Sequence, residues 1–501
     1  MEETQDELER DERWCDQRYV KSRLALLLVM VGLLVVVFNI LQKADSLGKA
    51  QGVFSEWALR GDMNARLSFA YHYWSKKVPR RPKFVGFPYA KDDFLFNAKE
   101  SYDRAIVEAP WPRYIRRLLI IENALGYGDI MRLVQLLEES AARPEFNKTE
   151  QQRLLDEAAM WRAVLLTPGV PREQVREYEK AIRRLGLGWY EHLALAALYR
   201  KAGLADQANL ELAAAEKSAI IGLAILCALG VTAFLLMLLG MVFLLVYTAL
   251  KKGNTSLESP TRLPPNRGKV AVLLLEVFVF YLITFLAVQM AGSIFLGMLF
   301  QITKSDRATF LILATVANYV ASGLIGIFYL ALRLRHEGWD WEMLGWKSTN
   351  LVRNALYGAG GYAAALVLVS SGAVISQVLG KYFPQEQNPV LPLMMQANNL
   401  IDKLSLFLLV AVAAPIIEEI FFRGVLLNSF RAVWGRGWAI VLSAVIFASV
   451  HPFPVHFLPV LGLGIILGVL AYDRGSLTPS ITAHAIQNIA VFSMLLLLTG
   501  S

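Results

Sequence analysis

Residues 404–428 decide the fold, and they read LSLFLLVAVAAPIIEEIFFRGVLLN. A helix of about 20 apolar residues spans the hydrocarbon core of a bilayer, and this stretch is long enough to do so. It nevertheless contains Glu418, Glu419 and Arg423. A charged Asp, Lys or Arg at the centre of a membrane helix costs about 2.5–3.5 kcal/mol on insertion scales, so ionisable residues there are retained chiefly for function or for pairing with one another. The stretch therefore predicts a membrane helix whose ionisable side chains serve function or pair with one another.

Similar apolar runs surround this stretch on both sides. One of them, 24–42, follows a polar leader and is expected to be an uncleaved anchor. The others lie in the C-terminal part of the chain, at 218–250, 271–303, 309–332, 355–380, 437–451, 455–472 and 479–499. We therefore predict nine spans in an all-α polytopic membrane helix bundle, namely one anchor and a block of about eight. The composition, 55% hydrophobic and 18% charged, excludes an ordinary soluble or disordered chain.

The order of polar and apolar segments predicts four regions. They are a cytosolic tail (1–23), the anchor (24–42), an extracytoplasmic helical domain (43–217) and a membrane core (218–501). In the third region, WYEHLALAALYRKAGLADQANLELAAAEK resembles one tetratricopeptide repeat, with Gly203 at its turn. Such a helical hairpin would contact a protein partner, and a helical domain with a generic apolar core is the alternative.

The charges indicate a topology and argue against nucleic acid as a partner. The net charge of +8 comes from basic residues that flank apolar runs and form no concentrated basic face. One set of loops in the core carries twelve Lys and Arg residues and the opposite set four, so the first set should be cytosolic. This places the N-terminus in the cytosol and residues 43–217 outside. Two cysteines, Cys15 and Cys227, exclude a disulfide framework.

Three i, i+4 pairs lie in the last four spans. Glu419 and Arg423 share a helix face and can form an ion pair, while Glu418 is turned about 100° away. Phe447 and His451 form the second pair, and His484 and Asn488 form the third.

The depths of these groups in the membrane agree. If Arg431 and Arg436 mark the cytosolic end of a helical hairpin, Glu418 lies about 20 Å and His451 about 22 Å from that end. His484 and Asn488 reach a similar level. A carboxylate with an imidazole can deprotonate water, which typically contributes about 10²–10⁴ in rate. A histidine and an asparagine can stabilise an oxyanion, at about 10²–10³ for each donor. No Ser or Cys stands beside a base, so a covalent nucleophile is not expected.

The three pairs stand in this chain as EEIFFR, FASVH and HAIQN. In this they resemble the EExxxR, FxxxH and HxxxN motifs of the CPBP intramembrane proteases, which include type II CAAX prenyl endopeptidases and bacteriocin-processing enzymes. The resemblance implies a hydrolase in which Glu418 and His451 activate water and His484 and Asn488 stabilise the oxyanion. Supporting residues would be Glu419, Arg423 and Phe447.

The resemblance leaves the cofactor open, because the family is described both as metalloprotease and as glutamate protease. If a metal such as Zn²⁺ is present, Glu418, His451 and His484 would hold it. The HExxH arrangement of metalloproteases is absent, which favours metal-independent activation of water.

The expected activity is endopeptidase cleavage of a membrane-associated protein or peptide, in a bacterial inner membrane. A non-catalytic scaffold or immunity protein on the same fold is one alternative, and it would be expected to lose a motif residue. A proton-coupled transporter is the other, and it predicts inverted repeats. The polar residues instead crowd into the last four spans, and no motif residue is missing.

Overall fold

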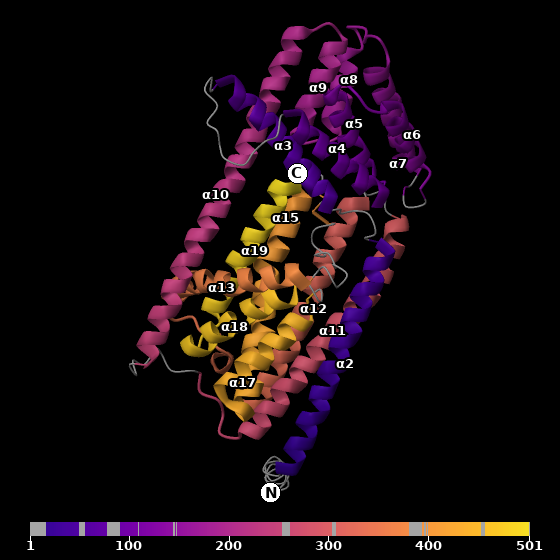
Figure 1. The fold of residues 1–501 in the computed structure, drawn as a ribbon. Coiled ribbons are helices and arrows are strands. Elements are labelled where there is room, and N and C mark those ends of the chain that lie inside the picture. Colours follow the sequence, from indigo (N-terminus) through magenta and orange to yellow (C-terminus); the bar gives the residue numbers. More distant parts are fainter. Residues whose placement is uncertain are drawn as a thin grey trace. The chain divides into compact units, whose positions relative to one another are not determined.

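A computed structural model describes most of the chain. The described residues are 17–49, 56–77, 91–108, 110–143, 146, 148–252, 261–302, 307–379, 393–394, 397, 399–451 and 456–499. Every regular element among them is a helix, which confirms the predicted all-α fold (Figure 1). Most of the predicted tail and Cys15 lie outside the described residues.

Seven helices in this part of the chain are long and apolar enough to cross a membrane. They are Arg18–Ile40, Ala205–Ala249, Arg267–Gly292, Thr309–Glu337, Leu351–Val378, Leu400–Ser449 and Phe457–Arg474. The prediction of nine spans differs for two reasons. The runs 404–428 and 437–451 fall within one of the seven, because helical residues continue without a break from one run to the other, although the chain reverses direction between them at Gly435. The run 479–499 corresponds to α19 (Thr478–Thr499), whose N-terminal half is polar and which is not among the seven.

The chain forms two compact units. The first, here the membrane unit, comprises Met1–Leu47 and Val231–Ser493, and the second, the helical unit, comprises Gly48–Gly230 with Met494–Ser501. The helices of the helical unit are α3 (Glu56–Lys77), α4 (Lys91–Glu108), α5 (Pro112–Leu125), α6 (Ile130–Ala141), α7 (Lys148–Trp161), η1 (Arg162–Leu166), α8 (Val175–Arg184) and α9 (Tyr190–Lys201). The first part of α10 (Ala205–Lys252) completes them.

Consecutive helices of the helical unit pack on one another as hairpins, among them α3 with α4, α6 with α7 and α8 with α9. The predicted hairpin at 189–217 is formed by α9 and the start of α10. Gly203 lies at its turn with φ 73°, a conformation that favours glycine, and Leu195 and Ala208 are buried. Whether the unit is a tetratricopeptide domain stays a prediction.

The helical unit contains a buried polar network. The Tyr102 hydroxyl lies 3.4 Å from Asp62 Oδ1, 3.3 Å from the Tyr190 hydroxyl and 3.3 Å from Arg117 Nη1. Burial disfavours the phenolate and raises the pKa of Tyr102 to about 12. The network therefore joins α3, α4, α5 and α9. Its tyrosines stay protonated at neutral pH.

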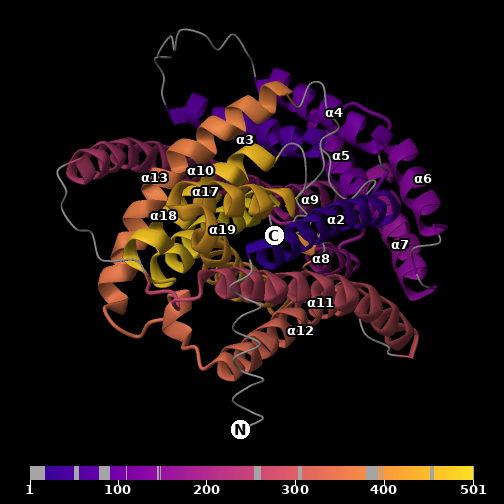
Figure 2. The same ribbon diagram turned by 90° about the horizontal axis from the view of Figure 1, so that it is seen from below.

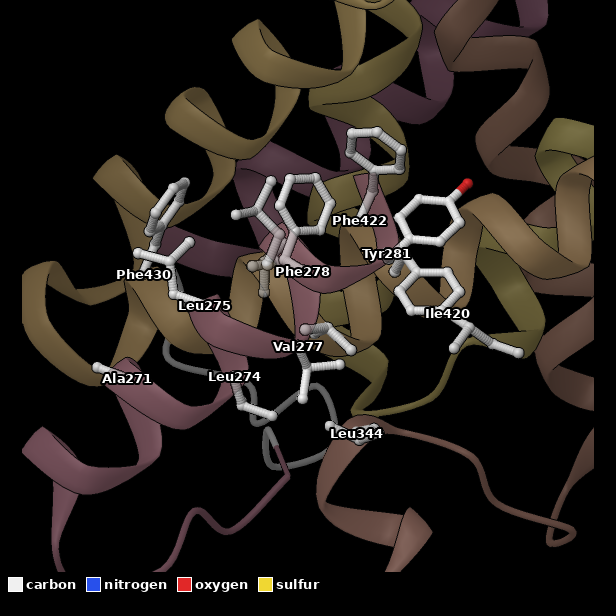
Figure 3. Packing of buried hydrophobic residues seen from close by; sticks show 14 of the residues in the cluster. Ala271, Leu274, Leu275, Val277, Phe278, Tyr281, Leu344, Ile420, Phe422 and Phe430 are labelled. Atoms are coloured by element: carbon white, nitrogen blue, oxygen red, sulfur yellow. The ribbon is translucent and has the colours of Figure 1, made fainter. Parts of the chain in front are cut away.

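The membrane unit is a bundle of long helices (Figures 1 and 2). They are α2 (Gln17–Lys49), the end of α10, α11 (Arg267–Ile302), α12 (Arg307–Glu337), η2 (Trp341–Leu344), α13 (Leu351–Leu379), α15 (Leu400–Leu408), η3 (Leu409–Ala413), α16 (Ala414–Glu419), η4 (Ile420–Leu426), α17 (Leu427–Ser449), α18 (Phe457–Arg474) and α19. Helix α11 packs against both α12 and α17, and α18 packs against α13 and α17. An aromatic core joins them, in which Tyr281 stacks on Phe421 with centroids 3.7 Å apart and Phe278 packs edge-on against Phe422 (Figure 3).

The predicted hairpin between Glu418 and His451 is present. Gly435 has φ 74° and ψ −172° within α17, a backbone conformation that is essentially confined to glycine. The Phe422 and Phe447 rings, on either side of it, have centroids 5.0 Å apart. Twenty-five residues of straight helix would separate them by about 37 Å, so the chain reverses direction at Gly435.

Candidate active site

The helix that carries the two glutamates is irregular on both sides of them. Segment α16 lies between two π-helical segments, η3 and η4. Such widened turns are rare and frequently occur at functional sites. Side-chain amides bind carbonyl groups of both segments: Asn488 Nδ2 donates to Val410 O at 2.8 Å, and Asn428 Nδ2 donates to Gly424 O at 2.7 Å. The local winding is thus stabilised from α19 and from α17.

Glu419 is fully buried and joins two of the three motifs directly. Its Oε1 accepts from Arg423 Nη1 at 2.9 Å, so the predicted ion pair is present, and it also lies 3.0 Å from His484 Nδ1. Arg423 Nη2 donates to Gly464 O at 3.3 Å. Removing one partner of a buried ion pair typically costs about 3–5 kcal/mol, because the other charge is left without compensation. This buried pair therefore connects α16 and η4 to α18 and α19.

Phe447 connects the second motif, FASVH, to the other two motifs. Its ring centre lies 4.2 Å from Arg423 Cζ, 4.7 Å from the His451 ring and 5.7 Å from the His484 ring. The side chain is fully buried. One aromatic ring therefore packs near both histidines and the ion pair.

Glu418 is less buried than Glu419, with 17% of its side chain exposed. The Tyr319 hydroxyl donates to its Oε1 at 2.7 Å. Its Oε2 lies 3.7 Å from His484 Nε2 and accepts no hydrogen bond from the described residues. We expect Glu418 to lack Arg423 as a partner, and this geometry is consistent with that expectation. The contact between Tyr319 and Glu418 was not predicted from the sequence. That tyrosine lies in the run 309–332 outside any motif, and a tyrosine in a membrane helix is too common to mark a site.

His451 is held by its own helix. Its Nδ1 lies 2.7 Å from the carbonyl oxygen of Phe447, which can only accept, so Nδ1 carries the hydrogen. In the neutral ring Nε2 then has a free lone pair. The Glu418 carboxylate acts on this imidazole electrostatically. The structure thus brings Glu418, His451 and His484 close together, as the matching depths predict. The neighbouring Pro452 lies outside the described residues.

The surroundings of His484 and Asn488 define which hydrogens they can offer. His484 directs one ring nitrogen at Glu419 and the other at Glu418, so when both nitrogens are protonated the ring can donate in two directions. Asn488 uses one N–H for Val410, and its amide carries a second. Both side chains can still donate to a further acceptor.

The described residues do not fit a metal site. No group of three or more His, Cys, Asp and Glu side chains among them is arranged to hold a metal ion. This includes Glu418, His451 and His484, the set expected to bind Zn²⁺ if a metal is present. We therefore derive no step through a metal.

The geometry agrees with a comparison to known families. Residues 400–490 match a family model described as type II CAAX prenyl endopeptidase Rce1-like. This match supports a membrane protease of the CPBP family, and residues 400–490 are here named the CPBP segment. No curated protein and no solved structure matches the chain.

The CPBP segment includes all three motifs, from Glu418 to Asn488. It extends from α15 into α19 and so excludes α2, the helical unit, α11 and α12. Tyr319, which binds Glu418, therefore lies outside it. Together with the apolar helices, the match supports an integral membrane protein with protease activity of the CAAX type.

Proposed function

We propose that this chain is an intramembrane endopeptidase that hydrolyses a peptide bond with water activated by Glu418 and His451. The observation that supports it most concerns the carboxylate oxygen Oε2 of Glu418. A buried carboxylate oxygen that accepts no hydrogen bond from the described residues lies in the neighbourhood of two imidazoles. Buried acceptors without a donor are rare in folded proteins and often occur where a water or a ligand binds.

In the proposed reaction, a water molecule donates hydrogen bonds to Glu418 Oε2 and His451 Nε2. One of these groups takes a proton as the water oxygen attacks the carbonyl carbon of the substrate. Preorganised donors are effective because they need no reorganisation as charge develops. The tetrahedral oxyanion accepts hydrogen bonds from protonated His484 Nε2 and from the second N–H of Asn488. The abstracted proton then passes to the leaving amine, the C–N bond breaks, and a carboxylic acid and an amine are released.

Glu419, Arg423 and Phe447 have supporting roles in this proposal. Their ion pair and ring contacts would fix the orientation of His484. A metal-independent reaction is favoured, because the residues present supply a base and two oxyanion donors.

The proposed substrate is a membrane-associated protein or peptide, and the proposed location is a bacterial inner membrane with the N-terminus in the cytosol. The predicted extracytoplasmic domain, residues 43–217, would contact a protein partner or the substrate. Its helical hairpins support this part of the proposal.

The experiment that tests this proposal is cleavage of a peptide library by the purified protein in liposomes. We expect Glu418→Gln and His451→Ala each to lower the rate at least about 100-fold, consistent with loss of general base catalysis. His336→Ala, at an exposed histidine in α12, is the matched control and should cleave as the wild type does. Undiminished cleavage in both site variants would overturn the assignment. Inhibition by EDTA that Zn²⁺ reverses would instead favour a metalloprotease.

A further inference from the structure

Helix α2 lies outside the CPBP segment, but its side chains are part of the core of the membrane unit. Leu24, Leu27 and Val31 are buried in the same apolar cluster as Phe278 and Phe422. An anchor that only tethered the chain would present lipid-facing residues all round. Helix α2 instead buries one face in the cluster that supports the candidate active site.

An amide on α2 binds the end of the helix that leads to His451. Asn39 Nδ2 donates to the carbonyl oxygen of Ser449 at 2.8 Å and to Val35 O at 2.8 Å. Ser449 is the last residue of α17, and the last four carbonyl groups of a helix have no partner within it. In a bilayer an unsatisfied backbone group is costly, so this donor stabilises the end of the helix. His451 follows two residues later.

The neighbouring residue of α2 reaches the other half of the site through a chain of rings. The Phe38 and Phe285 rings have centroids 5.8 Å apart, and the Phe285 and Tyr319 rings pack edge-on at 5.7 Å. Tyr319 in turn donates to Glu418. Two consecutive residues of α2 are therefore connected to both groups that would activate water.

We propose that Asn39 is a positioning residue for His451, so that α2 completes the active site and does not serve only as an anchor. This inference rests on the proposed function. By binding the Ser449 carbonyl, Asn39 holds the C-terminal turn of α17, and that turn supplies the Phe447 carbonyl that accepts from His451 Nδ1. Losing the amide lets this turn shift, and the His451 imidazole then changes its position relative to Glu418.

The test compares three variants of the full chain in liposomes. Asn39→Leu removes the donor at similar volume, Asn39→Gln keeps an amide, and Val36→Leu changes an exposed position of the same helix. We expect Asn39→Leu to lower kcat about tenfold or more with little change in KM, Asn39→Gln to recover most of that loss, and Val36→Leu to match the wild type. The thermal midpoint of each variant in detergent shows whether it is folded.

A second readout does not depend on activity. In protein labelled with ¹⁵N-histidine, the His451 imidazole signal is identified by its loss in His451→Ala. We expect Asn39→Leu to shift this signal and Val36→Leu to leave it in place. An unchanged signal together with wild-type kcat in folded Asn39→Leu would overturn the inference. If His451→Ala itself cleaves normally, the proposed function fails instead, and the shifted signal alone would still support a contact between α2 and the end of α17.

Discussion

At Glu418 the two carboxylate oxygens have different surroundings. Oε1 accepts from the Tyr319 hydroxyl, and Oε2 lies 3.7 Å from His484 Nε2. A hydrogen bond to one oxygen orients the carboxylate, so that its other oxygen has a defined direction. His451 shows the same principle, because its Nδ1 is occupied by the Phe447 carbonyl and its Nε2 is free. In both side chains one atom is used for orientation and the other is available for chemistry.

Tyr319→Phe tests this division of roles at Glu418. The variant keeps the ring against Phe285 and removes only the hydroxyl, so we expect cleavage to fall about tenfold, the factor that corresponds to about 1.4 kcal/mol. Tyr329→Phe, on the same helix and stacked on Phe280, is the control. A Tyr319→Phe variant with the wild-type rate would contradict a role for this hydroxyl.

At the scale of elements, the reversal at Gly435 is what brings the first two motifs together. The conformation at this residue has φ 74° and ψ −172°, and a side chain there adds strain of about 1–3 kcal/mol. The two arms of the hairpin then meet through Phe422 and Phe447.

Gly435→Ala should therefore lower the stability of the membrane unit by about 1–3 kcal/mol, measured as a lower unfolding midpoint in detergent. The matched control is Gly437→Ala, two residues along. A Cβ there meets no atom within 4 Å and φ is not positive, so we expect little change or a slight gain. Equal effects of the two substitutions would show that the backbone at Gly435 is not the constraint.

The sequence predicts local features of the site well and long-range ones poorly. The Glu419–Arg423 ion pair and the shared face of Phe447 and His451 follow from helical spacing alone. The apolar runs gave the fold class, which the structure confirms. The contact between Asn39 and Ser449 joins positions 410 residues apart, and no periodic pattern indicates such a pairing. The π-helical segments were also missed, because their sequence is as apolar as that of an ordinary membrane helix.

At the scale of the whole molecule, the described part of the chain combines apolar helices with a unit of paired polar helices. The excess of Lys and Arg in one set of loops supports the proposed orientation, with the N-terminus in the cytosol and the helical unit outside. Orientation is a property of the chain in its membrane and needs a measurement there.

Cysteine labelling in spheroplasts tests the orientation. In a chain with Cys15→Ser and Cys227→Ser, we expect Glu139→Cys to react with a membrane-impermeant maleimide. His336→Cys should react only after the membrane is permeabilised. Both positions are exposed, so access to the side chain itself does not limit either reaction. The reverse pattern would place the helical unit in the cytosol.

The widened turns beside the two glutamates make the site sensitive to how this helix is wound. Each residue of an α-helix advances the side-chain direction by about 100°, and a widened turn takes up an extra residue by advancing less at each one. If η4 kept its length but took ordinary α-helical winding, Glu418 and Glu419 would rotate away from His484, although the sequence would be as apolar as before. A hydropathy profile would not register this change, which would separate the first motif from the third.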